Sequence, residues 1–217
     1  MPSLVRRFLR LKNNYRNFDT RDALKRMQAF RCSVRHILGL GRPVALELLG
    51  SIAFGITVKD SDTDCILMHF CKEHDDDCPE ECSELALIRE ELVKALGAYM
   101  YDDERFHLEI LDWINLKCVE RVVDSSSVVS SDILNRFMYY RTIGRPVNRP
   151  LIVKYSDALE CSSEFMDRFD AWASDVMKDY LKTSSHQHSF NKYNERIRGS
   201  GLRLPQELQE ELGRYLK

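Results

Sequence analysis

The chain has 217 residues, 44 % of them hydrophobic, which is enough to bury a core in one domain with an appendage or in two small domains. Its 32 Lys and Arg residues nearly balance 34 Asp and Glu residues, and the net charge of −2 excludes a strongly basic or acidic protein. No apolar stretch is long enough to cross a membrane, and the N-terminus lacks the apolar run of a secretory signal. Seven cysteines at irregular spacing lead us to expect a cytoplasmic protein with free thiols.

The first half of the chain predicts alternating helices and strands. Asp19 or Thr20 can cap the first helix, and Gly39 can end it. Short apolar runs without helical spacing are typical of buried strands. We expect a helix over 20–39, strands over 44–49 and 65–70, a helix over 83–99 and a strand over 105–113.

The second half is predicted to be mainly helical. Phe165, Phe169, Trp172, Val176 and Tyr180 recur three to four residues apart, as on the buried face of a helix. We expect a helix over 132–141, an edge strand over 143–147, a polar break over 183–191 and a last helix that begins at Pro205.

A candidate phosphate-binding turn follows the apolar run 44–49. Gly50 lets backbone N–H groups approach a phosphate closely, and the hydroxyl of Ser51 adds a donor. Gly55 permits a second unusual turn in the polar loop that comes next.

Asp62 and Asp64 stand at the start of the next predicted strand. Because alternate residues of a strand share a face, we expect both carboxylates to point the same way. Two such carboxylates repel each other unless a cation joins them, and hard oxygen ligands suit Mg²⁺. Ser-Asp-x-Asp also occurs in ordinary turns and helix caps, so its combination with Gly50 and Ser51 is what indicates a site.

These residues together resemble the signature of the DNA polymerase β-type nucleotidyltransferase superfamily, in particular its minimal and aminoglycoside-type members. The signature appears here as Leu49, Gly50-Ser51, Gly55, Ser61-Asp62-Thr63-Asp64 and Ile66-Leu67. The resemblance covers about residues 20–115 and implies an α+β fold with a small mixed β-sheet and packed helices. Loop positions that are often basic in the family hold Ile52 and Phe54.

The chain is expected to divide into a basic N-terminal arm over 1–19, a nucleotidyltransferase domain over 20–150 and a helical C-terminal unit over 151–217. The family needs a third carboxylate on a later strand, and 106–113 offers Glu109 and Asp112. The two have opposite parity in a regular strand, so both cannot face the metals. We favour Glu109 because it is central in the strand.

The resemblance also implies a mechanism. Asp62, Asp64 and Glu109 would bind two Mg²⁺ ions, or Mn²⁺ in their place, about 3.5–4 Å apart. Gly50 and Ser51 would hold the β- and γ-phosphates of an NTP, with ATP as the first choice. An NMP would then pass to an acceptor hydroxyl of a small molecule, a protein side chain or an RNA end. The alternative is a catalytically silent, antitoxin-like binding module with the same fold.

Two further groups of residues have functional and ordinary interpretations. Cys71, His74, Cys78 and Cys82 are possible zinc ligands, or incidental thiols in a surface loop whose Asp75, Asp76 and Asp77 suit harder ions. The basic N-terminal region can grip a nucleic acid or cover the outside of a helix. Its members are Arg6, Arg7, Arg10, Lys12, Arg16, Arg21, Lys25 and Arg26, interleaved with Phe8, Tyr15 and Phe18.

Overall fold

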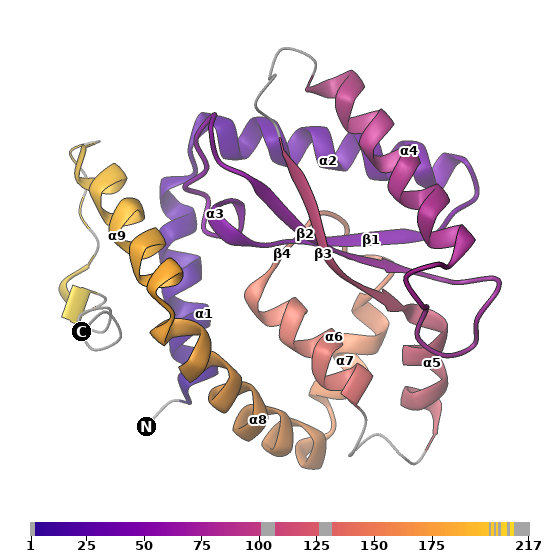
Figure 1. Ribbon diagram of the computed structural model, residues 1–217. Coiled ribbons are helices and arrows are strands. Elements are labelled where there is room, and N and C mark those ends of the chain that lie inside the picture. The colour runs from indigo at the N-terminus through magenta and orange to yellow at the C-terminus, as the bar shows by residue number, and fades with distance from the viewer. Residues whose placement is uncertain are drawn as a thin grey trace.

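A computed structural model describes residues 3–100, 107–125, 132–199, 201, 203, 205–207, 209 and 210, and shows a small sheet between two groups of helices (Figure 1). Its helices are α1 (Leu4–Tyr15), α2 (Arg21–Gly39), α3 (Gly50–Ala53), α4 (Ser83–Tyr99), α5 (Leu116–Asp124), α6 (Asp132–Ile143), α7 (Val153–Glu160), α8 (Ser163–Lys182) and α9 (Ser184–Gly199), with a 3-10 turn at Arg16–Phe18. Its strands are β1 (Val44–Leu48), β2 (Thr63–His69), β3 (Leu108–Asn115) and β4 (Arg145–Pro146). The expected α+β fold with a small mixed sheet is confirmed.

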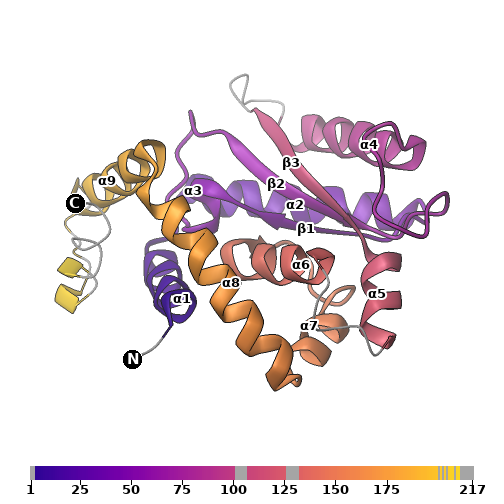
Figure 2. The ribbon, with the colours of Figure 1, turned by 60° about the horizontal axis from the view of Figure 1, so that its bottom comes forward.

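The described strands form one sheet in the order β3-β2-β1-β4. β1 is antiparallel to both β2 and β4, whereas β2 and β3 are parallel. β1 is buried along its whole length, because helices cover both faces of the sheet. Figure 2 shows α2 and α4 on one face and α6 with α8 on the other.

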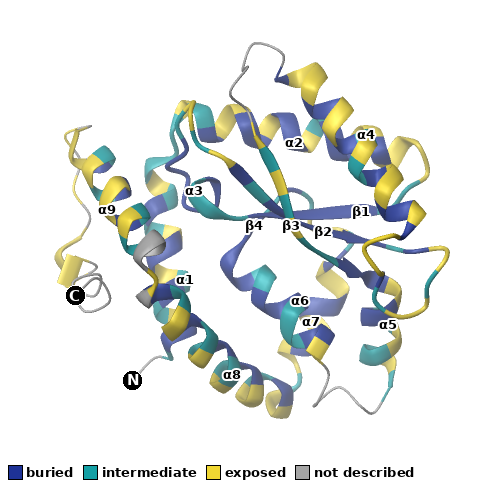
Figure 3. Cartoon of the chain, in the orientation of Figure 1, coloured by how far each residue is buried: buried dark blue, intermediate teal, exposed yellow. Residues whose placement is uncertain are grey.

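Successive side chains of the strands alternate between two separate cores. One core contains Val44, Leu46, Leu48, Cys65 and Leu67 together with apolar residues of α2 and α4. The other contains Ala45, Ile66, Met68 and Ile114 together with apolar residues of α1, α5, α6, α7, α8 and α9. Figure 3 shows that the helices are buried on their inward sides and exposed on their outer sides.

The basic N-terminal segment is a packed helix over residues 4–15. Ser3 caps α1, and the side chains of Phe8 and Tyr15 are 3 % and 0 % exposed. Their rings meet that of Phe54 edge-on, with centroids 5.8 and 5.6 Å away. Two of the three aromatic residues considered for contact with nucleic acid therefore lie in the core instead.

Residues 183–191 differ from the prediction of a polar break. α9 begins at Ser184, and its Phe190 and Tyr193 pack against Phe54 with ring centroids 5.3 and 5.6 Å away. The local sequence is polar, so tertiary packing of these two rings explains the helix. At the C-terminal end, residues 206, 207, 209 and 210 are helical, whereas Leu208, Leu212 and Leu216 lie outside the described residues.

The start of α5 was not predicted either. Asn115 ends β3 and accepts a hydrogen bond from the backbone N–H of Lys117, which is an N-cap interaction.

Part of the predicted strand, residues 105 and 106, lies outside the described residues. Among the helices that the structure describes, none has the length and apolar character needed to span a membrane.

A buried ion pair fixes the loop between α3 and β2. Arg145 donates two hydrogen bonds to the carboxylate of Asp19, at 2.8 and 2.7 Å. Asp19 contacts Gly55, where φ is +76° and an added Cβ would lie 1.9 Å from Asp19 Oδ1. The backbone N–H of Thr20 donates to the carbonyl of Gly55 at 2.8 Å. Gly55 is thus required both by its backbone conformation and by the space around it.

We expect Gly55→Ala to lower the free energy of unfolding by about 3 kcal/mol. The alanine would be held in a left-handed conformation, and its Cβ would displace the carboxylate of Asp19 from Arg145. Gly97→Ala in α4 is the matched control, since no atom lies within 4 Å of its added Cβ. A helical Gly→Ala change should raise the free energy of unfolding by up to about 1 kcal/mol. Urea denaturation measures both, and equal midpoints for the two variants would contradict the role of Gly55.

Candidate functional site

The Gly-Ser turn lies directly beside Asp64. The backbone N–H of Leu49 donates to the carbonyl of Asp64 at 2.8 Å, which joins the end of β1 to the start of β2. Gly50 has φ +59°, and a Cβ there would lie 2.9 Å from Asp64 Oδ2. The hydroxyl oxygens of Ser51 and Thr57 are 3.2 Å apart. A glycine at position 50 therefore lets the backbone approach the carboxylate closely.

Asp64 and Glu109 are direct neighbours across the parallel pair β2–β3. They share one face of the sheet because they are opposite each other in the register. Asp64 is half-buried and Glu109 is exposed. Asp62 precedes β2 in an exposed position. The family resemblance predicted a third carboxylate on a later strand than that of Asp64, and the structure has Glu109 on the strand that pairs with β2.

The three carboxylates form one electrostatic group. Burial raises the pKa of Asp64, and the negative charges of Glu109 and then Asp62 raise it further. In the part of the chain that the structure describes, the sets of three possible ligand atoms within 4.8 Å of one another both lie in residues 71–82. At least one pair among the three carboxylates is therefore wider than this spacing.

Arg26 holds the loop that carries Asp62. Its side chain is 1 % exposed and donates to the carbonyls of Lys59, at 2.7 Å, and Ser61, and to the hydroxyl of Thr63 at 2.8 Å. Arg26 was predicted to be among the residues that can grip a nucleic acid, whereas in the structure it positions a loop of the protein itself. Its spacing on the apolar face of α2, three residues after Ala23, was the available signal.

A β-bulge separates Glu109 from Asp112. Cys65 pairs with Ile110 and Ile66 pairs with Asp112, so Leu111 has no partner in β2. The expectation that the two acids face opposite sides is wrong for this strand, because it assumed regular alternation. Asp112 shares the sheet face of Asp64 and Glu109.

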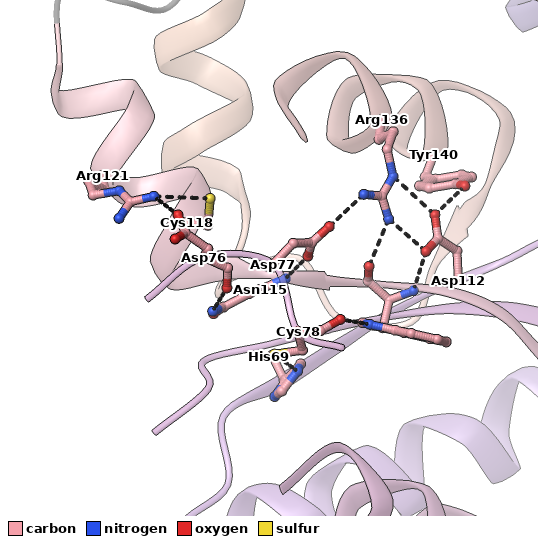
Figure 4. A network of polar contacts seen from close by, with 11 residues as sticks. His69, Asp76, Asp77, Cys78, Asp112, Asn115, Cys118, Arg121, Arg136 and Tyr140 are labelled. Carbon is pink, nitrogen blue, oxygen red and sulfur yellow. Dashed lines mark hydrogen bonds and ion pairs between the residues drawn. The ribbon is translucent and has the colours of Figure 1, made fainter. Parts of the chain in front are cut away.

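The carboxylate of Asp112 is bound by other side chains of the protein, as Figure 4 shows. Arg136 donates to it at 2.6 and 3.2 Å, and the hydroxyl of Tyr140 donates at 2.6 Å. Its own Oδ1 also accepts from the backbone N–H of Trp113. Glu109 is exposed, whereas Asp112 is neutralised, and this difference favours Glu109 as a cation ligand.

A cavity of about 220 Å³ opens beside Asp64 and Gly50. Its wall combines the turn with apolar and aromatic side chains of β3, α6, α8 and α9. The residues are Leu49, Gly50, Phe54, Asp64, Leu111, Ile143, Tyr180, Ser189, Phe190 and Tyr193. An apolar cavity with few polar groups at one end is the usual form of a site for a small organic molecule.

Glu47 is a buried acid of β1 that the sequence argument did not single out. Its side chain is fully buried, and burial raises its pKa to about 7, although Arg141 at 2.6 Å opposes this. Nearby Lys12 donates to the carbonyl of Gly144 at 2.7 Å, and burial lowers its pKa to about 8. Arg141, like Arg145, is therefore engaged in an internal ion pair.

Comparison of the chain with models of protein families, with curated protein sequences and with solved structures finds no match.

We expect Asp64→Asn to raise the melting temperature at neutral pH in buffer without divalent cations. A raised pKa in the folded chain means that stability is lost as pH rises through that pKa, and the amide removes this loss. The shift should be about 2–4 °C for each kcal/mol of repulsion removed, and it should vanish in acid, where Asp64 is protonated. Differential scanning calorimetry over pH measures it.

Asp112→Asn is the matched control for this experiment. It leaves Arg136 and Tyr140 without their charged acceptor, so we expect a loss of about 1–3 kcal/mol. A fall in melting temperature for both variants would show that the charge of Asp64 stabilises the fold, instead of being destabilised by burial and by the neighbouring carboxylates.

Proposed function

We propose that this protein is a Mg²⁺-dependent nucleotidyltransferase that moves an NMP from an NTP to an acceptor hydroxyl. The observation that carries the proposal is the placement of Asp64 beside Glu109 and against Gly50, with Asp62 in an exposed position just before the same strand. A half-buried acid whose pKa is raised by burial and by two neighbouring negative charges is the arrangement that a divalent cation relieves.

The residues present fit hard divalent cations. Asp62, Asp64 and Glu109 would hold Mg²⁺, or Mn²⁺ in its place, because each offers only oxygen ligands. Two bound ions would activate the acceptor hydroxyl and neutralise charge on the departing pyrophosphate. Asp112 is left out of this set, since Arg136 and Tyr140 bind its carboxylate.

The turn after β1 would receive the phosphates of the NTP. Gly50 leaves the backbone open to close approach, and Ser51 offers a hydroxyl donor that now faces Thr57. Ile52 and Phe54 are buried and uncharged, so the turn provides no cationic side chain at these positions. Neutralisation of the triphosphate would depend on the metal ions more than on the loop.

The adjoining cavity would receive the organic part of a substrate. Its volume of about 220 Å³ is smaller than the roughly 300–1,000 Å³ of typical ligand pockets, so it suits one ring system with a sugar. Tyr180, Phe190 and Tyr193 offer aromatic faces or edges for stacking. Because the cavity touches Asp64, a molecule bound there would hold its reacting group beside the carboxylates.

A catalytically silent binding module is the second candidate. It is favoured by the spacing of the carboxylates, which do not all lie within 4.8 Å of one another. In this case the cavity would bind a molecule that undergoes no reaction.

The two candidates are separated by a screen of labelled NTPs, ATP first, with Mg²⁺ or Mn²⁺ and a cell extract as the source of acceptors. We expect labelling by the wild type to fall at least 100-fold in Asp62→Asn/Asp64→Asn and in Glu109→Gln, because loss of even an outer metal partner costs about 10–100-fold. Asp112→Asn, corrected for its folded fraction, should keep the activity.

Binding is measured in parallel by the rise in melting temperature with Mg²⁺ and ATP. An equal rise in the wild type and in the double variant would show that Asp62 and Asp64 take no part in binding Mg²⁺ and ATP. A rise confined to the wild type, with no labelling of any acceptor, would support the silent module.

We also expect Leu111→Ala to raise the KM for the NTP or the acceptor several-fold with little change in kcat. Leu111 lines the cavity, is 50 % exposed and is no metal ligand, so its truncation removes binding contacts without opening the core. Leu87→Ala is the control, since Leu87 is 44 % exposed on α4, which covers the other face of the sheet. Identical kinetic constants for both variants would show that the cavity does not bind a substrate of the reaction.

A further inference from the structure

Three buried thiols meet at the end of β2 that is farthest from Asp64. Cys71, Cys78 and Cys82 are 2 %, 6 % and 2 % exposed. Their sulfur atoms all lie within 4.8 Å of one another, and those of Cys71 and Cys82 are 3.7 Å apart. They come from three points of a 12-residue segment that has no regular secondary structure before α4.

His69 adds a nitrogen to this group. Its side chain is fully buried, and its Nε2 lies 3.6 Å from Cys78 Sγ. Its Nδ1 is buried and has no hydrogen-bond partner among the described residues. The nitrogen that faces the thiols is therefore Nε2, and it is the one that could bind an ion together with Cys78. Figure 4 shows His69 and Cys78 facing each other below the polar network.

These distances match the edges of a tetrahedral zinc site. Zn–S bonds of about 2.3 Å at tetrahedral angles separate two sulfur atoms by about 3.8 Å. With a Zn–N bond of about 2.0–2.1 Å, sulfur and nitrogen are separated by about 3.6 Å. The observed values, 3.7 Å for Cys71–Cys82 and 3.6 Å for Cys78–His69, agree with two of these edges. The three sulfur atoms already lie within 4.8 Å of one another, whereas the imidazole of His69 is near Cys78 and would have to move toward Cys71 and Cys82 to complete the site.

The three consecutive aspartates of the segment each have a basic partner. Asp75 pairs with Lys117, Asp76 with Arg121 and Asp77 with Arg136, the last at 2.5 Å. These aspartates are therefore bound by α5 and α6. Glu73 instead accepts a hydrogen bond from Ser83 and one from the thiol of Cys82, the latter at 3.7 Å, and the bond to Cys82 would be lost when its thiolate binds an ion.

His74, which the sequence spacing suggested as the fourth ligand, lies on another side of the group. Its side chain is 36 % exposed, and its Nε2 lies 4.0 Å from Glu73 Oε2. It forms a set within 4.8 Å with Glu73 and Cys82, but not with Cys71 and Cys78. Burial and proximity to Cys78 both favour His69.

The backbone around the thiols is held in place by β3. Asn115 accepts from the backbone N–H of Cys71 at 3.2 Å and donates to the carbonyls of His74 and Asp76 at 2.9 and 2.6 Å. The indole N–H of Trp113 donates to the carbonyl of Cys78 at 2.7 Å. A preformed segment of this kind loses little conformational entropy when an ion binds.

We propose that Cys71, Cys78, Cys82 and His69 bind one Zn²⁺ ion. Four protein ligands leave no open position, so the ion would be structural and would join the end of β2 to the start of α4. The site is separate from the carboxylates and does not depend on nucleotidyl transfer.

The test is the zinc content of the full-length protein, purified without chelator from cells supplied with zinc, and measured by mass spectrometry of the elements. We expect one zinc per chain in the wild type and in His74→Gln. We expect Cys82→Ser and His69→Gln to lose zinc, with an affinity at least tenfold weaker in competition with a chromogenic chelator. His74→Gln is the matched control because the chain spacing, unlike the structure, makes it a ligand.

If the Cys82 and His69 variants do not fold, titration of the apo wild type with Co²⁺ decides the matter. Intense bands of tetrahedral, thiolate-bound Co²⁺ that are lost on adding Zn²⁺ would support the site. Weak bands of octahedral Co²⁺ would overturn it, as would a wild type that neither contains nor binds zinc. A Cys71–Cys82 disulfide in the purified protein, seen as a mass lower by two hydrogen atoms, would also overturn the assignment. So would zinc loss in His74→Gln but not in His69→Gln.

Discussion

The fixed register of β2 between β1 and β3 is the constraint on which both candidate sites depend. β2 is paired along both edges and covered on both faces, so it can neither slide nor turn without exposing one core. This register sets Asp64 opposite Glu109 at one end and His69 opposite Asn115 at the other. One buried strand thus carries the candidate oxygen ligand Asp64 near its beginning and the candidate nitrogen ligand His69 at its end.

Internal arginines give the surrounding loops their shape. Arg26 binds the loop before β2, and Arg145 binds Asp19 beside Gly55. Both guanidinium groups therefore form hydrogen bonds within the protein. Arg136 joins Asp77 to Asp112 and so links the cysteine segment to β3. Buried, well-bonded charges of this kind specify one arrangement of a loop. They also explain why a chain with many basic residues shows a candidate site dominated by acids.

Local pattern was sufficient for the main elements but not for their irregularities. Apolar runs predicted β1 and β2, and the run that follows Asp64 predicted that the two aspartates stand at the entrance of β2, where the structure has Asp64 in the strand and Asp62 just before it. The bulge at Leu111 was beyond reach, because an unpaired residue is visible only against a partner strand. Chain spacing likewise suggested His74, whereas burial singled out His69, since only the folded chain shows which imidazole turns inward. α9 needed the ring of Phe54, which is distant in sequence.

The unpaired Leu111 divides β3 into two lengths with independent alternation. Before it, Glu109 is open to solvent; after it, Asp112 is held by Arg136, while Trp113 lies against Arg89 of α4 at 5.3 Å. If β3 alternated regularly through Leu111, with no bulge, Asp112 and Trp113 would exchange sides, and a carboxylate would enter the core under α4. Because of the bulge, the exposed residue Glu109 can be replaced by another side chain without changing which residues after Leu111 pack against the core.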